Sequence, residues 1–130
     1  MTPLSTSTSD AELIAFVDQW AALLEKKAYS EAFAFTDQAP NNGWTAELIQ
    51  EFIEGYNEAV PGQHFTLEGK PTDISQRKNV RRFPKNRASC IGQVWYDLNI
   101  NGFASDITAT FGVVSVQDGL ILQLDDIHVM

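Results

Sequence analysis

The sequence predicts one α+β domain, with three helices in its first half and an antiparallel sheet in its second half. The 130 residues, 44% of them apolar, are enough to bury a single core. Apolar residues recur at helical spacing in the first half of the chain. In the second half they alternate with polar residues between tight turns, which is typical of a sheet with one buried face.

Three helices are predicted from their caps and apolar faces. The first begins after Ser9, which has capping-box spacing to Glu12. Its apolar face consists of Leu13, Phe16, Val17, Trp20, Leu23 and Leu24. A second, shorter helix is predicted after Ser30. A third is predicted after the cap Thr45, and it ends at Pro61-Gly62.

The segments outside the helices are less regular until the long strands begin. Residues 1–8 are polar and are expected to form a flexible N-terminus. Residues 64–68 alternate and are predicted to form a short strand. Residues 69–87 are predicted to form a long loop with room for a short strand or turn. The end of this loop, residues 77–87, is a basic block that holds six of the nine Lys and Arg residues and no acid.

The basic block contrasts with the rest of the chain, where three Lys face seventeen acids, a net charge of −14. Such a body repels nucleic acid and attracts a basic partner. The block can bind an anion such as phosphate, with Phe83 as a stacking residue. It can also be a solvated loop that relieves the acidic surface, and we prefer this interpretation. The basic residues are Arg77, Lys78, Arg81, Arg82, Lys85 and Arg87.

Three strands are predicted after the basic block, over residues 88–100, 103–116 and 120–130. Asn101-Gly102 is the sequence of a type I′ hairpin turn, and Asp118-Gly119 predicts a second tight turn. The first hairpin therefore has a register that can be counted from its turn.

The counted register separates an apolar face from a polar face. The apolar face contains Val94, Tyr96, Leu98, Ile100, Ile107 and Ala109, and it is expected to meet the helices. On the polar face, Asp97 is expected opposite Asp106, on a wet side of the sheet. Alternation in the last strand breaks at Asp125-Asp126, where a β-bulge would restore one apolar face.

The order of helices, long loop and hairpinned strands resembles the nuclear transport factor 2-like superfamily. The resemblance rests on the opening helix (ELIAFVDQWAALLEKKAYSEAFAF), the third helix after Trp44, and the blocks VWYDLNINGFASDITATFGVV and LILQLDDIHVM. It implies a cone in which a curved sheet wraps on three helices. The superfamily contains enzymes, carrier-like binders, protein-interaction modules and bacterial immunity proteins, so the fold alone does not choose a function. Plain cystatin-like domains are an alternative, but they usually have one long helix.

Enzymes of this superfamily often place an acid–base pair of Asp or His inside the cone. His128 and Asp126 are two residues apart on one strand and should share a face, with Ala109 opposite His128. A histidine beside a carboxylate can act as a general base near neutral pH. Further candidates are Tyr96, Asp125, Asp97, Asp106, Tyr56 and His64. No third catalytic member stands at a recognisable spacing, so a catalytic pair is not preferred.

A partner-binding surface is predicted on the polar face, at Trp95, Asp97 and Asp106. An exposed Trp among acids is a common interface anchor, although the loop at 69–87 can cover it instead. Two facing carboxylates repel each other unless a cation or a raised pKa compensates. With no third ligand visible, a metal site is not expected. The same face can serve a homodimer.

The preferred function is a non-enzymatic protein-interaction domain. An immunity protein that neutralises a basic toxin is one form of it. The alternative is a small-molecule enzyme or carrier that uses the cone interior and a His/Asp pair. No cofactor is expected, because metal-ligand spacing, a Gly-rich phosphate loop and a nucleophile motif are absent. A cytoplasmic location is expected, because neither a signal peptide nor an apolar run of membrane length is visible.

Overall fold

The computed structural model describes residues 3–37, 43–58, 62–66, 77–83, 90–101, 103–117 and 119–129. In these ranges, three helices precede five strands of one antiparallel sheet, which confirms the α+β class. The helices are α1 (Asp10–Glu25), α2 (Tyr29–Phe35) and α3 (Ala46–Glu58). The strands are β1 (Phe65–Thr66), β2 (Lys78–Arg82), β3 (Cys90–Ile100), β4 (Phe103–Val116) and β5 (Gly119–Val129).

The helix starts follow the predicted caps. The Ser9 side chain accepts a hydrogen bond from the Glu12 backbone, and the Glu12 carboxylate accepts one from the Ser9 backbone at 3.1 Å. The Thr45 hydroxyl caps α3 by accepting from the Leu48 N–H at 3.1 Å. Helix α2 begins slightly earlier than predicted, because Lys27 adopts a left-handed conformation (φ 59°) that turns the chain directly after α1.

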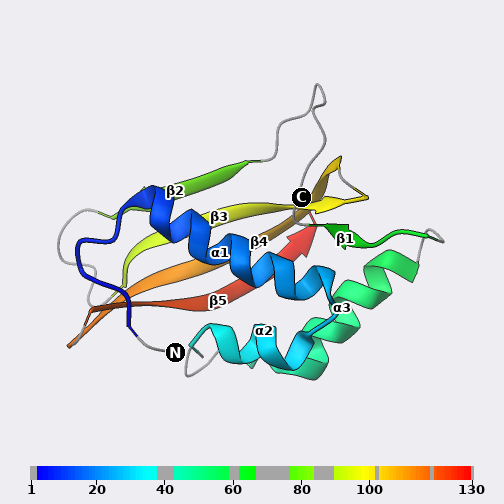
Figure 1. The fold of residues 1–130 in the computed structure, drawn as a ribbon, viewed down its shortest axis with the longest axis horizontal. Coiled ribbons are helices and arrows are strands. Elements are labelled where there is room, and N and C mark those ends of the chain that lie inside the picture. Colours follow the sequence, from blue (N-terminus) through cyan, green and yellow to red (C-terminus); the bar gives the residue numbers. More distant parts are fainter. Residues whose placement is uncertain are drawn as a thin grey trace.

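The sheet has the order β1-β3-β4-β5, and β2 pairs with β3 on the same edge as β1. Helix α1 lies along the sheet, and α2 packs against α3 (Figure 1). Strand β2 lies within residues 69–87, so part of the predicted long loop is a strand. No helix in the described part of the chain is long and apolar enough to cross a membrane.

The β3–β4 hairpin starts in the predicted register and then leaves it. Asp97 pairs with Thr108, two positions further along β4 than the predicted Asp106. Ser105 holds the extra residues in a bulge, because its hydroxyl donates to the Leu98 carbonyl at 2.6 Å. The predicted pairing of Asp97 with Asp106 is therefore wrong. A shift of two positions keeps the paired residues beyond the bulge, such as Thr108 and Ala109, on their predicted faces.

The bulge predicted at the Asp pair of the last strand is confirmed. Consecutive residues of β4 pair with Leu124 and Asp126, so Asp125 is the extra residue of β5. Leu124 and Ile127 are both buried as a result. Asp125 and Asp126 are both exposed near the end of β5.

The space between the helices and the sheet is filled by apolar side chains. Trp20 of α1 and Phe111 of β4 are fully buried, and their rings meet edge to face with centroids 4.9 Å apart. Other large side chains in this core are Leu13, Leu24, Ile49, Ile53, Tyr96, Ile107, Leu120 and Leu122. The predicted apolar faces of α1 and of the hairpin therefore supply the core.

The described part of the N-terminus is held against the sheet, contrary to the prediction of a flexible segment. Leu4 and Leu120 exchange two backbone hydrogen bonds of 2.7 and 2.8 Å. Gly119 permits this approach, because a Cβ atom there would lie 2.0 Å from the Leu4 carbonyl oxygen, and its φ of +147° also favours glycine.

Candidate functional site

Strand β2 uses part of the basic block to attach α1 to the sheet. Lys78 Nζ lies 2.8 Å from Asp18 Oδ1, and Arg82 Nη2 lies 2.8 Å from Asp10 Oδ1. Lys78 and Arg82 both point toward α1, because alternate residues of a strand share one face. The opposite charges of the basic block and of the first helix are thus neutralised against each other.

Two further residues of the predicted anion site, Arg77 and Arg81, lie in the described part of the chain. Arg77 pairs with Asp97, with Nε 2.9 Å from Oδ2, and Arg81 is exposed. Lys85 and Arg87 lie outside the described residues. Three of the four described basic side chains of the block therefore bind carboxylates of this chain, which leaves little free positive charge for an anion.

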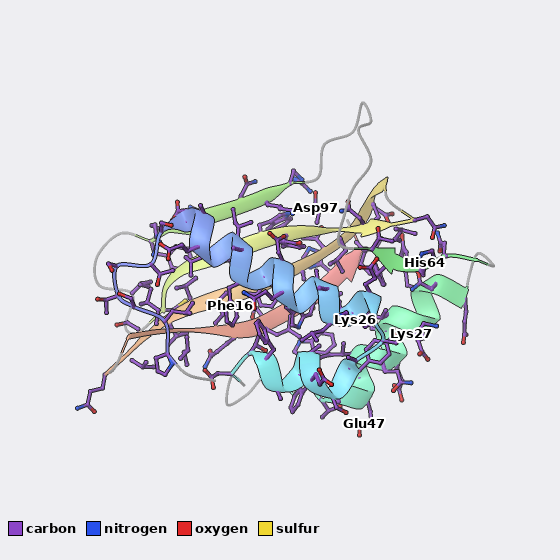
Figure 2. All side chains as sticks on the ribbon, viewed as in Figure 1. Phe16, Lys26, Lys27, Glu47, His64 and Asp97 are labelled. Carbon is purple, nitrogen blue, oxygen red and sulfur yellow. The ribbon has the colours of Figure 1, made fainter. Side chains whose placement is uncertain are left out.

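The polar face of the sheet is buried around Asp97, although it was predicted to be wet. The side chain of Asp97 is only 7% exposed, between β2 and β3 (Figure 2). Its carboxylate accepts hydrogen bonds from the Thr108 hydroxyl (2.8 Å) and from the backbone and side chain of Arg77 (3.2 and 2.9 Å). Thr108 is itself fully buried. The contacts identify Asp97 as an internal clamp on β2 rather than a free interface residue.

Trp95 lies beside this clamp and is half-buried. The Arg77 guanidinium lies 5.5 Å from the Trp95 ring centroid, and the His128 ring meets the indole edge to face at 5.6 Å. Arg77 belongs to residues 69–87, so part of that segment covers Trp95, as one of the two sequence interpretations proposed. Trp95 is therefore no isolated exposed anchor.

The predicted acid–base pair is found on the face of the sheet that points away from the helices. His128 Nδ1 lies 3.3 Å from Asp126 Oδ2. The two atoms are close, but their geometry is not that of a hydrogen bond. The side chains are 30% and 56% exposed. His128 pairs with Thr108 and not with Ala109. The turn places Val116 opposite Gly119, which moves the register by two positions, and the extra residue Asp125 moves it back by one.

Tyr96 is separated from this pair by the sheet. It is fully buried on the helix side, where its hydroxyl donates to Asp18 Oδ1 at 2.5 Å. Lys78 binds the same carboxylate oxygen. Tyr96, Asp126 and His128 therefore do not converge, and Tyr96 has a structural role in holding α1. The remaining candidate, His64, is exposed just before β1.

Tyr56 of α3 and Asp106 of β4 form a second cross-link between helix and sheet. The Tyr56 hydroxyl donates to Asp106 Oδ1 at 2.5 Å. Burial, followed by the hydrogen bond and the charge of Asp106, raises the pKa of Tyr56 to about 12. Asp106, predicted to face a partner, is therefore engaged by the chain's own helix.

This contact predicts alkaline behaviour that can be measured. Because the folded-state pKa of Tyr56 lies above its usual 10.0, the stability that the contact contributes is complete below pH 10 and is lost as the pH rises toward about 12. Phenolate absorbance of the wild type minus that of Tyr56→Phe should show this late titration. Asp106→Asn should move it back toward pH 10, and an ordinary titration of Tyr56 in the wild type would contradict the assignment.

A groove between the start of α3 and the end of β5 combines apolar and acidic side chains. Its volume is about 520 Å³, within the range of ligand and side-chain pockets. It is lined by Gly43, Trp44, Leu48, Glu51, Phe52, Asp125 and Asp126. Leu48 is 44% exposed, which is unusual for a large apolar residue of this chain. We call these seven residues the α3–β5 groove.

Two local features create the α3–β5 groove. The indole N–H of Trp44 donates to the Asp125 carbonyl at 3.1 Å, and this bond holds the ring in place. The two residues are 81 positions apart in the sequence. The bulge at Asp125 adds a second feature, because Asp125 and Asp126 are both exposed and both line the groove. The bulge was predicted from the sequence, but no local signal brings Trp44 to it.

Comparison of this chain with protein-family models, with curated proteins and with solved structures gives no match. The function is therefore argued from the geometry described above.

Proposed function

We propose that this chain is a non-enzymatic binding domain that captures a basic protein partner through the α3–β5 groove. The observation that carries the proposal is the pairing of an apolar floor with three carboxylates. The aliphatic stem of an Arg or Lys side chain can lie on Leu48 and Phe52. Its cationic head can then reach Trp44 and the carboxylates at the rim.

The charge of the chain supports the same partner chemistry. The net charge is −8, and three cations of the basic block are already paired with carboxylates of this chain. A basic protein would be attracted over a long range and would associate quickly at low ionic strength. An immunity-type role, in which the partner is a basic toxin such as a nuclease, is one form of this proposal.

The fold resemblance is a proposal of the same standing. Three helices followed by a hairpinned antiparallel sheet support a nuclear transport factor 2-like, cone-type domain. A small-molecule enzyme or carrier acting in the interior is the weaker proposal, because Trp20, Tyr96 and Phe111 occupy that space. A homodimer through the sheet face is also weaker, because Asp97 and Thr108 are bound within the chain.

A short helical peptide of leucine and arginine is a direct probe of the groove. Added to ¹⁵N-labelled protein, it should shift the indole N–H signal of Trp44, identified by its loss in Trp44→Phe, and the signals of Leu48 and Glu51. Reversal of one rim charge in Glu51→Lys should weaken binding by about tenfold, because one desolvated carboxylate is lost and a like charge is introduced.

Glu31→Lys is the matched control, because Glu31 is exposed on α2 and its reversal changes the net charge equally. This variant should weaken binding by no more than about twofold, an effect of the overall field alone. Equal losses in the two variants, or shifts spread over α1, would show that the peptide senses only the net charge. The proposed site would then be wrong.

A further inference from the structure

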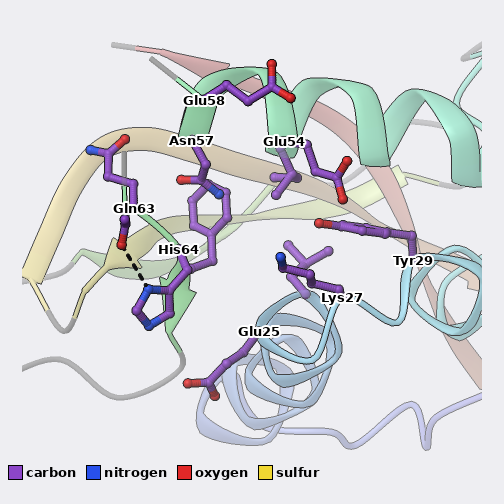
Figure 3. A pocket seen from close by; sticks show the side chains of 12 residues that line it. Glu25, Lys27, Tyr29, Glu54, Asn57, Glu58, Gln63 and His64 are labelled. Atoms are coloured by element: carbon purple, nitrogen blue, oxygen red, sulfur yellow. Dashed lines mark hydrogen bonds between the residues drawn. The ribbon is translucent and has the colours of Figure 1, made fainter. Parts of the chain in front are cut away.

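A second cavity lies at the opposite end of α3, between the end of α1, the start of α2 and β1 (Figure 3). Its volume is about 500 Å³, which suits a small molecule. Leu24, Ile53 and Phe65 form an apolar floor, and each is at most 3% exposed. This floor belongs to the core, so it is rigid and preformed.

Two opposite charges project into this cavity without pairing with each other. Lys27 ends α1 in a left-handed conformation (φ 59°), and its ammonium group points inward from one side (Figure 3). Glu54 of α3 lies on the other side, close to the hydroxyl of Tyr29. No ion pair joins Lys27 to Glu54 in the described structure, so each charge can receive a ligand group.

The carboxylate of Glu54 is held in place by the chain. Gln50 Nε2 donates to Oε2 at 3.4 Å, and the Tyr29 hydroxyl lies close to the carboxylate (Figure 3). Burial and then the negative charge of Glu54 raise the pKa of Tyr29, so its hydroxyl stays protonated. Glu25 and Glu58 stand at the edge of the cavity, with their carboxylates turned outward (Figure 3).

An unused hydrogen-bond acceptor lies in the wall of the cavity. Asn57 Oδ1 is buried, and it has no hydrogen-bond partner among the described residues. Leaving a buried acceptor unsatisfied costs about 1–3 kcal/mol, so a turn of the Asn57 amide that brings Oδ1 to a ligand N–H group would be favoured. Figure 3 shows Asn57 above the same space that Lys27 and Tyr29 enter.

We propose that this cavity binds a small amino-acid-like zwitterion with an apolar side chain. The ammonium group of the ligand lies between Glu54 and Asn57 Oδ1, and its carboxylate binds Lys27. The apolar side chain rests on Leu24 and Phe65. The zwitterion supplies both charges that the cavity leaves unpaired, which a purely cationic or anionic ligand does not. The proposal does not depend on the α3–β5 groove, because the two sites share no lining residue.

Free phenylalanine, phenethylammonium and 3-phenylpropionate are matched probes, because they share one ring and differ in charge. Each probe is titrated into ¹⁵N-labelled protein. Phenylalanine should shift the NMR signal of the Asn57 side-chain amide. The two singly charged probes should bind about tenfold more weakly, each having lost one ion contact. Equal binding of phenethylammonium would show a cation site, and equal binding of phenylpropionate an anion site. Either result, or no binding by any probe, overturns the proposal.

Two variants separate the roles of the two charges. Glu54→Gln keeps the shape of the side chain and removes its charge. It should lower the affinity for phenylalanine about tenfold while leaving that for phenylpropionate nearly unchanged. Lys27→Gln should lower the affinity for phenylalanine about tenfold while leaving that for phenethylammonium nearly unchanged. Glu51→Gln, on the same helix but in the α3–β5 groove, is the matched control and should bind phenylalanine as the wild type does. Urea unfolding of each variant establishes that it is folded, and a loss of affinity in the control equal to that in Glu54→Gln would overturn the assignment.

Discussion

Replacing Asp97 by alanine is expected to destabilise the domain by about 2–3 kcal/mol. The substitution removes the acceptor of the Thr108 hydroxyl, which is fully buried and would remain without its partner. A buried donor left unsatisfied costs about 1–3 kcal/mol. The contact of β2 with β3 is weakened as well, because Arg77 binds the same carboxylate through its backbone and side chain. Arg77 is half-exposed, so its own ion pair adds only a modest part.

Urea unfolding monitored by Trp fluorescence measures this effect as a fall in the transition midpoint. Asp125→Ala is the matched control, because that carboxylate is exposed on β5, and its loss should change stability by less than about 0.5 kcal/mol. Thr108→Val combined with Asp97→Ala should cost less than the two single losses together, since each removes the other's partner. Equal midpoints for Asp97→Ala and Asp125→Ala would refute the clamp.

The clamp also changes how the sequence-based binding surface is tested. Charge reversal at Asp97 would be the direct test of a partner surface on the polar face. The structure shows that Asp97→Lys would place a second cation beside Arg77 in a site with little access to water. Loss of partner binding in that variant would report unfolding of β2 and not the loss of an interface contact.

The fold class could be predicted because its signals are local. Capping spacing fixed the starts of α1 and α3, and the Asn101 turn fixed the start of the hairpin, where Asn101 has a φ of 52°. The register beyond the turn could not be predicted. It depends on the Ser105 hydroxyl bonding to a carbonyl on the facing strand, and nothing in the alternation of apolar residues records this contact.

The polar face was wrongly predicted to be wet, because its burial depends on contacts between segments that are distant in the sequence. The pattern of Asp97, Asn99, Thr108 and Thr110 is that of a solvated strand face, yet all four are at most 5% exposed. Buried polar side chains need partners, and for Asp97 the partners are Thr108 and Arg77 of the basic block. The compensation of charge between the block and the acidic body was visible in composition, but which carboxylates take part was not.

The α3–β5 groove shows the same limit. Its acidic rim follows from the bulge at Asp125, which the broken alternation predicted. Its connection to α3 depends on Trp44, which meets β5 through a hydrogen bond to a residue 81 positions away. Composition and periodicity describe neighbours along an element, so a site built across elements remained outside their reach.

Replacing Trp20 by alanine is expected to have the largest effect of any single substitution considered, about 3–5 kcal/mol. The side chain is fully buried and meets Phe111 edge to face, so its loss removes transfer free energy and leaves a cavity at the centre of the core. Urea unfolding should show a fall in stability close to the whole stability of a small domain. The near-ultraviolet signal of the remaining aromatics should weaken even before denaturant is added.

Trp20→Phe separates the contribution of the apolar indole volume from that of the indole N–H group. The Trp20 Nε1 atom is buried and has no hydrogen-bond partner in the described part of the chain, so its N–H contributes a desolvation cost and no bond. Phenylalanine keeps most of the apolar volume and removes that donor, so it should cost no more than about 1.5 kcal/mol. If both variants were tolerated equally, the interior would have to contain spare volume around Trp20. An interior ligand, which the filled core now argues against, would then become the better proposal.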